Sequence, residues 1–476
     1  MTRPSLRAYS IGSTAALLIL CFNLSCGGNR GAGTVYNVLD FGAVGDGETN
    51  DGPAIQRAVD ACFSGGRGGG QVLLPAGKVF LSGSITLRSF VDFHLEKGTI
   101  LKATDDRQAY AHIGSFIDDS AGSLLNADSA TNLTISGEGV IDGNGYAFMG
   151  ELNGDIFTPE DARPIMIFLT VCDHLTIRDI TIKNSPFWAI HPIGCDDVLV
   201  ESIRILNDMR IPNGDGIDPD HCRNVRIANC HIEAGDDCIV PKNGGGRYAD
   251  YGPCENITVT GCTLSSRSCA IKIGTGGHDI FRNFVFDSCV IYGSNRGLGI
   301  QIRDHVGCEN ILFSNMVIDT RHHSDLWWGK AEPIYVTAIP RTGETKVGRV
   351  KNIRFRNILC RGENGIFVHG WPGSPIEDIV FEDVRVQIEK TTDWKAGEYD
   401  LRPNNHYKGI YDHRIAGFYC RYAEDVTLQD VKIVWGPESP KEFGPALEVH
   451  DTSGLVLRNF NGSSAHPGVV PDRITD

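Results

Sequence analysis

One pattern recurs along most of this 476-residue chain: a turn residue, usually Asn or Asp, is followed by alternating apolar residues. Copies begin at Asn132, His174, Asp197, Asn224, Asn256, Asn283, Asn310, Asn352, Asp378 and Asp425. The commonest spacing is 27 residues, as from Asn256 to Asn283 and from Asn283 to Asn310. A fixed period of about 20–50 residues is the signature of a solenoid, and alternation with a period of two indicates strands rather than helices.

A second, shorter apolar strand recurs between these segments. Its copies are GIDPD from Gly216, CIVPK from Cys238, AIKIG from Ala270, GIQIR from Gly299, PIYVT from Pro333 and GIFVH from Gly365. Several strands per turn, stacked in register, predict an all-β fold, a single-stranded parallel β-helix. We expect it to occupy residues 35–476 as one domain.

A helix is predicted at the start of this domain. The sequence Asn50-Asp51-Gly52-Pro53 is typical of a capped helix start with Pro in the first turn. Apolar residues follow at helical spacing, namely Ala54, Ile55, Ala58, Val59 and Cys62. Because the end of a β-helix exposes unpaired strand groups, we expect this helix to cover the N-terminal end as a cap.

The first 26 residues resemble an export signal. Arg3 and Arg7 precede the apolar run 11–22, which is short for a membrane span. Leu24-Ser25-Cys26-Gly27 is similar to a bacterial lipoprotein cleavage box, so a lipid anchor at Cys26 and ordinary signal cleavage are both open. Residues 27–34 are then a flexible linker. The mature protein is expected to be exported, to the periplasm, the outer membrane or the extracellular space.

The net charge bears on which partners the protein can bind, and the cysteine positions bear on whether it forms disulfide bonds. The net charge of −15 argues against a nucleic-acid partner. Fifteen cysteines in an exported protein invite a disulfide interpretation. However, Cys230, Cys262 and Cys289 occupy the same place in successive repeats, which indicates a buried stack of free thiols. No cysteine spacing suggests a zinc site. We expect a monomer.

Three carboxylates stand just ahead of two neighbouring copies of the short strand. They are Asp215 in NGDGID and Asp236 and Asp237 in GDDC. Adjacent strands lie about 4.8 Å apart, so the three side chains are expected to form one cluster. Hydrolysis of a glycosidic bond needs such a set, with one carboxyl protonated as the acid and others ionised to activate water. Solvated loop residues or calcium ligands are the alternatives.

Aligning the short strands predicts which other side chains face the same cleft. The reference residues are Ile217, Ile239, Ile271, Ile300, Ile334 and Ile366. One and three residues after them stand polar or aromatic side chains, and the preceding repeat offers a sugar-stacking Trp and a hydrogen-bonding His. The candidate substrate contacts are Trp188, His191, Asp218, Lys242, Lys272, Gln301, Arg303, Tyr335 and His369. The alternative is that the outward Lys and Arg only solvate the sheet and that Trp188 is a packing residue.

Together these features resemble the family 28 glycoside hydrolases, the polygalacturonase family of pectin-degrading β-helix enzymes. The opening NVLDFGAVGDGETNDGPAIQRAVDAC, SPFWAIHP, NGDGID and GDDC carry the resemblance, which covers roughly residues 35 to 460. It implies a right-handed β-helix and inverting hydrolysis of α-glycosidic bonds in a pectic poly- or oligosaccharide. By resemblance Asp236 is the general acid, while Asp215 and Asp237 hold and deprotonate the attacking water. Acid and base carboxyls are then expected about 6.5–9.5 Å apart, with no metal or cofactor.

The chain departs from this family at two motifs. The family's Gly-His-Gly, which carries a histidine of the catalytic site, is matched by Ser268-Cys269-Ala270. Its Arg-Ile-Lys, which grips the uronate carboxylate, is matched by Gln301-Ile302-Arg303, and Lys272 is a candidate replacement cation. Rhamnogalacturonan hydrolases of the family also lack the histidine. Rhamnogalacturonan hydrolase or rhamnosidase activity is therefore an alternative.

Long segments between repeats are expected to form the cleft walls: 319–332, 337–350 and 388–416. Trp327 and Trp328 in the first suit sugar stacking. Walls that close one end of the groove would favour removal of end sugars over mid-chain cleavage. Two other classes stay open: a β-helix polysaccharide lyase using Ca²⁺ and a cationic base, and a non-catalytic carbohydrate-binding β-helix, which has no reason to align three aspartates.

Overall fold

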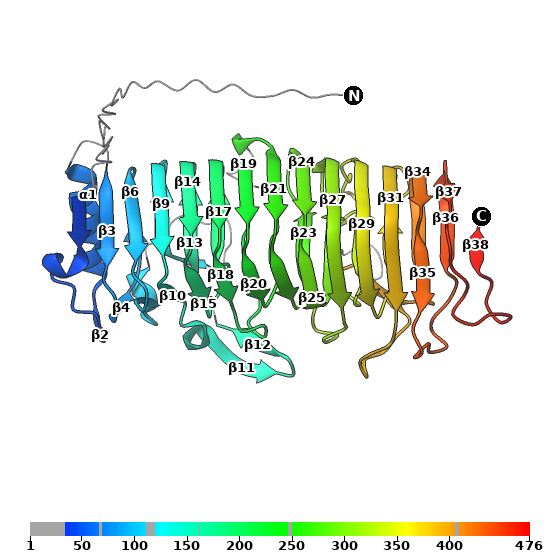
Figure 1. Ribbon diagram of the computed structural model, residues 1–476, viewed down its shortest axis with the longest axis horizontal. Coiled ribbons are helices and arrows are strands. Elements are labelled where there is room, and N and C mark those ends of the chain that lie inside the picture. The colour runs from blue at the N-terminus through cyan, green and yellow to red at the C-terminus, as the bar shows by residue number, and fades with distance from the viewer. Residues whose placement is uncertain (1–33, 66–68, 111–119, 161, 246–249, 405–408) are drawn as a thin grey trace, which may run out of the picture. The chain divides into compact units, whose positions relative to one another are not determined.

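The computed structural model describes residues 34–65, 69–110, 120–160, 162–245, 250–404 and 409–476. The predicted signal and lipidation site at residues 1–26 lie outside these residues, as does the linker apart from Thr34, which begins the first strand. In the described part, thirty strands are joined by parallel pairings into one continuous coiled sheet (Figure 1). The fold is a right-handed parallel β-helix, as the sequence predicts. None of the helices in these residues has the length and apolar character needed to cross a bilayer.

Each coil of the solenoid, here called a rung, contributes to three columns of strands. The first column contains the long repeat strands: β1 Thr34–Asn37, β3 Gly70–Leu74, β6 Val91–Leu95, β9 Thr131–Gly137, β14 Asp173–Arg178, β17 Asp196–Glu201, β19 Arg223–Ala228, β21 Cys254–Thr260, β24 Ile280–Asp287, β27 Gly307–Thr320, β29 Val350–Gly362, β31 Ile376–Ile388, β34 Phe418–Gln429 and β37 Val456–Arg458.

The second column follows it, with β27, β29 and β31 running through both. Its other members are β2 Asp46–Asn50, β4 Val79–Ser82, β7 Ile100–Ala103, β10 Val140–Asp142, β15 Thr181–Lys183, β18 Arg204–Leu206, β20 His231–Ala234, β22 Thr263–Ser266, β25 Val290–Ser294 and β35 Lys432–Trp435.

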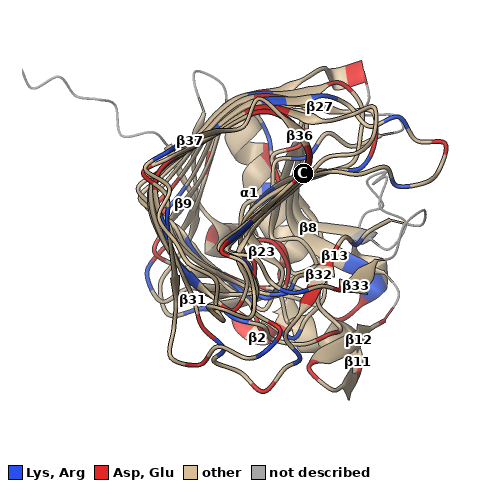
Figure 2. Ribbon diagram, turned by 90° about the vertical axis from the view of Figure 1, so that its right-hand side faces the viewer, with Lys and Arg blue, Asp and Glu red and all other residues tan. Residues whose placement is uncertain are grey.

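The third column holds the short strands and carries the functional site. Its members are β5 Ile85–Thr86, β8 Ser120–Asp128, β13 Arg163–Thr170, β16 Ile190–Ile193, β23 Cys269–Thr275, β26 Arg296–Ile302, β28 Ile334–Ala338, β30 Ile366–His369, the start of β34, β36 Leu447–Ser453 and β38 Arg473–Thr475. Two hairpins, β11 Met149–Asn153 with β12 Ile156–Pro159 and β32 Glu398–Asp400 with β33 Ile410–Asp412, project on the same side of the coil (Figure 2).

The turn residue that opens each repeat has a backbone role. All ten positions adopt a left-handed conformation, from Asn132 at φ 53° to Asp425 at φ 55°. Asn and Asp tolerate this conformation better than most residues. Asn side chains also stack: Nδ2 of Asn283 lies 3.1 Å from Oδ1 of Asn256, and Nδ2 of Asn310 lies 3.1 Å from Oδ1 of Asn283. The repeat is therefore punctuated by a turn that few other residues can form.

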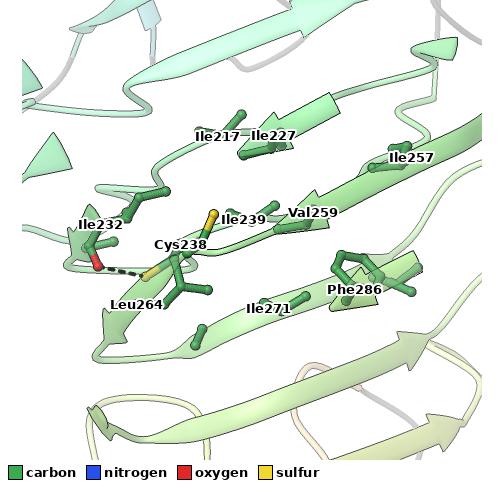
Figure 3. Packing of buried hydrophobic residues seen from close by; sticks show 14 of the residues in the cluster. Ile217, Ile227, Ile232, Cys238, Ile239, Ile257, Val259, Leu264, Ile271 and Phe286 are labelled. Carbon is green, nitrogen blue, oxygen red and sulfur yellow. Dashed lines mark hydrogen bonds between the residues drawn. The ribbon is translucent and has the colours of Figure 1, made fainter. Parts of the chain in front are cut away.

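The interior is filled by matching apolar side chains from successive rungs (Figure 3). Phe286, Phe313, Phe355 and Phe381 form a stack with ring centroids 4.8–5.0 Å apart. The thirteen cysteines in the described part are all buried and free, which confirms the thiol prediction. Cys238, for example, donates from Sγ to the carbonyl oxygen of Ile232.

The predicted N-terminal helix is α1 Gly52–Ser64, and it packs against β1 and β3 at the first rungs (Figure 1). All five of its predicted core residues are buried. Asp51 precedes it but does not cap it. Its carboxylate instead accepts the backbone N–H groups of Val44 and Gly45 at 2.7 and 3.0 Å.

Candidate active site

The three aspartates form one cluster on the third column. Ile217 pairs with Ile239 in a parallel bridge, so Asp215 and Asp237, each two residues earlier, lie on neighbouring rungs. One carboxylate oxygen from each of Asp215, Asp236 and Asp237 lies within 4.8 Å of the others. The predicted clustering is therefore present.

Glycines beside the aspartates allow the chain to pack this tightly. A Cβ on Gly216 would lie 2.3 Å from the carbonyl oxygen of Cys238. A Cβ on Gly235 would lie 2.2 Å from that of Ile211. Real Cβ atoms do not approach backbone so closely, so the Gly residues of both motifs are needed for the close approach.

Two lysines neutralise part of the cluster. Nζ of Lys242 lies 3.3 Å from Oδ2 of Asp215 and 3.0 Å from Oδ1 of Asp218. Lys272 donates from Nζ to Oδ2 of Asp237, whose Oδ1 accepts the backbone N–H of Cys269 at 3.1 Å. The carboxyl oxygens of Asp236 have no hydrogen-bond partner among the described residues, and its side chain is partly exposed. Asp236 is thus the member of the cluster that is free to meet a ligand.

Burial sets the proton affinities here. It raises the pKa of Asp215 and of Asp236 well above the usual carboxyl range, and the charges of neighbouring aspartates add to the rise. It also raises the pKa of Asp218 to about 7, against the charge of Lys242. Burial alone would lower the pKa of Lys242, but Asp218 and Asp215 raise it overall. The cluster can therefore hold a proton near neutral pH while both lysines stay charged.

The cluster opens into a cavity of ≈ 380 Å³. Trp188 forms one wall, stacked on Phe187 at 5.5 Å, with Nζ of Lys242 over its ring at 4.3 Å. Trp328 lines the cavity as expected, whereas Trp327 is only 5% exposed. The lining residues are Trp188, Asn213, Asp215, Asp220, Asp236, Asp237, Lys242, Gly244, Gly245, Lys272, Gly274–Gly277, Trp328 and Arg341.

Six predicted substrate contacts lie outside the cavity. His191 is fully buried behind Trp188, 3.4 Å from Asp220, and Asp218 is fully buried beneath Lys242. The other four are buried farther along the third column: Gln301, Arg303, Tyr335 and His369. The expectation that these side chains face the cleft is not met.

A loop explains the burial of two of these six residues, Arg303 and Tyr335. Residues 398–404, here called the closing loop, lie over the outer face of β26, β28 and β30. Arg303 donates to the carbonyl oxygens of Leu401 and Pro403 at 3.3 and 3.1 Å, and Tyr335 donates to that of Asp400 at 2.7 Å. The Tyr399 ring packs on Phe367 at 4.5 Å. Arg303 and Tyr335 thus bind the protein's own backbone.

The register of one strand also differs from the prediction. Ile271 pairs with Leu298, and Leu298 with Ile334, whereas the sequence alignment used Ile300. Gln301 therefore pairs with Thr337, and Gly299 lies beside Lys272. A shift of two residues keeps every side chain on the same face, so alternation alone cannot detect it.

One oxygen from each of the three carboxylates lies within 4.8 Å of the others, whereas the expected 6.5–9.5 Å is the separation of whole carboxyl groups and stays a prediction. Three oxygens this close could also hold a cation. The sequence motifs do not mark Arg341, Asp220 or the segment Gly274–Gly277 at the end of β23. Arg341 belongs to a segment predicted as a wall, but no motif marks it.

The chain belongs to the glycosyl hydrolases of family 28, whose sequence family matches residues 68–398. A probable polygalacturonase of Vitis vinifera is 34% identical over 279 residues, 56% of this chain and 56% of that protein. An exopolygalacturonase of Zea mays is 28% identical over 269 residues, 51% of this chain and 62% of that protein. The chain thus spans a little over half the length of these curated relatives.

Solved structures give the same picture of the fold. The hyperthermoactive exopolygalacturonase of Thermotoga maritima aligns with a TM-score of 0.65 at 25% identity, over 75% of this chain and 87% of that one. The family 28 exopolygalacturonase of Yersinia enterocolitica aligns with a TM-score of 0.68 at 19% identity, over 89% and 78%.

Proposed function

We propose that the protein is an inverting glycoside hydrolase that cleaves α-glycosidic bonds at the ends of pectic poly- or oligosaccharides, as a polygalacturonase does. The observation that carries this proposal is the cluster of Asp215, Asp236 and Asp237 in a cavity walled by two Trp. A carbohydrate-binding protein that holds no cation would have no reason to bury three carboxylates side by side.

The proposed reaction has one step. Asp236 donates its proton to the glycosidic oxygen as the bond to the anomeric carbon breaks. A water held by Asp215 and Asp237 attacks that carbon from the other face, and one of these carboxylates takes its proton. The raised pKa of Asp236 suits a donor near neutral pH. Inversion is proposed from the family motifs, not from the oxygen separation.

Action at chain ends is proposed from the closing loop. A polysaccharide in a groove along the third column would have to pass the outer faces of β26, β28 and β30, which the loop covers. A chain end fits such a cavity better than a chain interior. Three of the similar proteins reported above are named exopolygalacturonases, in agreement. Export, a lipid anchor at Cys26 and a monomeric state stay predictions from sequence.

The first test combines one substitution with product analysis. Asp236→Asn should lower the hydrolysis of oligogalacturonates by about 10²–10⁴-fold, because an amide cannot donate the proton. Folding should be unchanged. Asp383→Asn, an exposed Asp on β31, is the matched control. NMR of the fresh wild-type product should show inverted configuration, and near wild-type turnover by Asp236→Asn would remove Asp236 from the mechanism.

A polysaccharide lyase is the second candidate, because the three carboxylates could hold a cation beside Lys242 and Lys272. Elimination across a uronate would give an unsaturated product that absorbs ultraviolet light. We expect no such product and no loss of activity with EDTA. An ultraviolet-absorbing product whose formation stops with EDTA would favour the lyase.

A further inference from the structure

One cation of the cavity wall belongs to none of the motifs. Among the described residues, the cations that line the cavity are Lys242, Lys272 and Arg341. We propose that Arg341 is the specificity residue that binds the carboxylate of an acidic sugar in this cavity. The inference rests on the proposed hydrolase function. It names an acidic sugar as the substrate class and Arg341 as the residue that recognises it.

The two lysines already form ion pairs with aspartates of the cluster. Lys242 bridges Asp215 and Asp218, and Lys272 is bound to Asp237. Moving either ammonium toward a substrate would leave a buried aspartate without its partner. Four aspartates also line the cavity: Asp215, Asp220, Asp236 and Asp237. An anionic sugar entering this surrounding needs a positive group that is not used by the catalytic cluster.

Arg341 is such a group, and it is held in place before any ligand arrives. Its Nε lies 3.0 Å from Oδ1 of Asp304, and its Nη2 lies 2.8 Å from Oδ2. Nη2 also reaches Oγ1 of Thr275 at 3.4 Å, and the backbone N–H of Arg341 donates to Arg303 at 2.9 Å. Nη1 has no hydrogen-bond partner among the described residues, and the side chain is 35% exposed. One edge of the guanidinium is fixed and the other is available.

The backbone at Gly276, which faces the guanidinium of Arg341, leaves room for it only because Gly has no side chain. A Cβ on Gly276 would lie 2.0 Å from Oδ2 of Asp304 and 2.8 Å from Nη2 of Arg341. A larger residue would displace both groups. Gly276 itself lines the cavity, so the fork stands at the cavity surface. A planar guanidinium held in this way is the side chain best suited to grip a carboxylate.

The test compares an acidic substrate with its neutral twin. Digalacturonate and its methyl ester share ring and linkage but differ in charge. Arg341→Gln should lower kcat/KM for digalacturonate by ~10–150-fold, the range for hydrogen bonds to charged groups, and leave the ester within about 2-fold. Arg341→Lys should recover part of the loss. Arg349→Gln is the matched control, because Arg349 is 68% exposed, pairs with Glu377 and does not line the cavity.

Binding separates this inference from the proposed function. Calorimetry of oligogalacturonate should show weaker binding to Asp236→Asn/Arg341→Gln than to Asp236→Asn alone. Equal losses on acid and ester, or no loss on either, would overturn the role of Arg341. Absence of hydrolysis in the wild type, together with Arg341-dependent binding, would overturn only the proposed hydrolysis. If Arg341→Gln does not fold, Arg341→Lys must lose more kcat/KM on digalacturonate than on its methyl ester.

Discussion

At the scale of single residues, the site depends on a balance between burial and counter-charge. Lys272 is bound to Asp237, and its charge also opposes the rise in the pKa of Asp236. The lysine therefore affects both the residue proposed to hold water and the residue proposed to donate the proton. The repeat alignment predicted that Lys272 faces the cleft, and it lines the cavity. Its ion pair with Asp237 was not predicted.

Removing that charge should shift the pH dependence of the reaction. In Lys272→Met, Asp236 loses a neighbouring cation, so its proton is harder to remove and its pKa rises further. The alkaline limb of the kcat profile should then move to higher pH, while the maximum falls because Asp237 has lost its partner. Lys432→Met, at an exposed position on β35, should leave the profile unchanged. A shift of the limb to lower pH would contradict the assignment of Asp236 as the acid.

At the scale of structural elements, the left-handed turn residue is what makes each rung possible. Asn283 has φ 61° and takes part in hydrogen bonds with Asn256 and Asn310. Sequence could locate these turns because the residue type and the alternation after it are both local signals.

Substitutions at Asn283 should separate backbone strain from the side-chain ladder. Asn283→Ala places a side chain that cannot form local hydrogen bonds in a left-handed conformation, which costs up to about 1–2 kcal/mol in addition to the lost hydrogen bonds. Asn283→Gly loses the same hydrogen bonds without that strain. Urea unfolding should therefore rank the stabilities as Asn, then Gly, then Ala. Equal stability of the Gly and Ala variants would show that strain at the turn is not important.

The closing loop is the second element with a testable role. Arg303→Ala removes the guanidinium that donates to the carbonyl oxygens of Leu401 and Pro403, although Leu401 still accepts from Nδ2 of Asn404 at 2.8 Å. The lost hydrogen bonds should lower the free energy of unfolding by about 1–3 kcal/mol. Because Arg303 lies outside the cavity, turnover of digalacturonate and of its methyl ester should fall by the same factor. The exposed Arg356→Ala serves as the control for thermal unfolding. A loss of turnover confined to digalacturonate would show that Arg303 does contact the substrate.

At the scale of the whole β-helix, the sequence predicted what depends on neighbouring rungs. The strand columns, the thiol stack and the aspartate cluster all follow from repeats about 27 residues apart. Residues 388–416 were predicted as a cleft wall, but the contacts of the closing loop inside this segment were not, because they join Arg303 to Leu401 across 98 positions without any repeat to mark them. The register of β26 was missed because a slip of two residues conserves the alternation. Arg341 was missed because a single Arg in a wall segment resembles any surface charge.

The thirteen buried thiols carry a consequence for where such a chain can work. No covalent cross-link joins its described rungs, and each sulfur is shielded from solvent by the coil around it. A change in the redox potential of the medium therefore neither forms nor breaks a disulfide bond in the described part of the folded β-helix. The same folded protein should be able to persist in oxygenated and in strongly reducing media, without an oxidising folding pathway to assemble it.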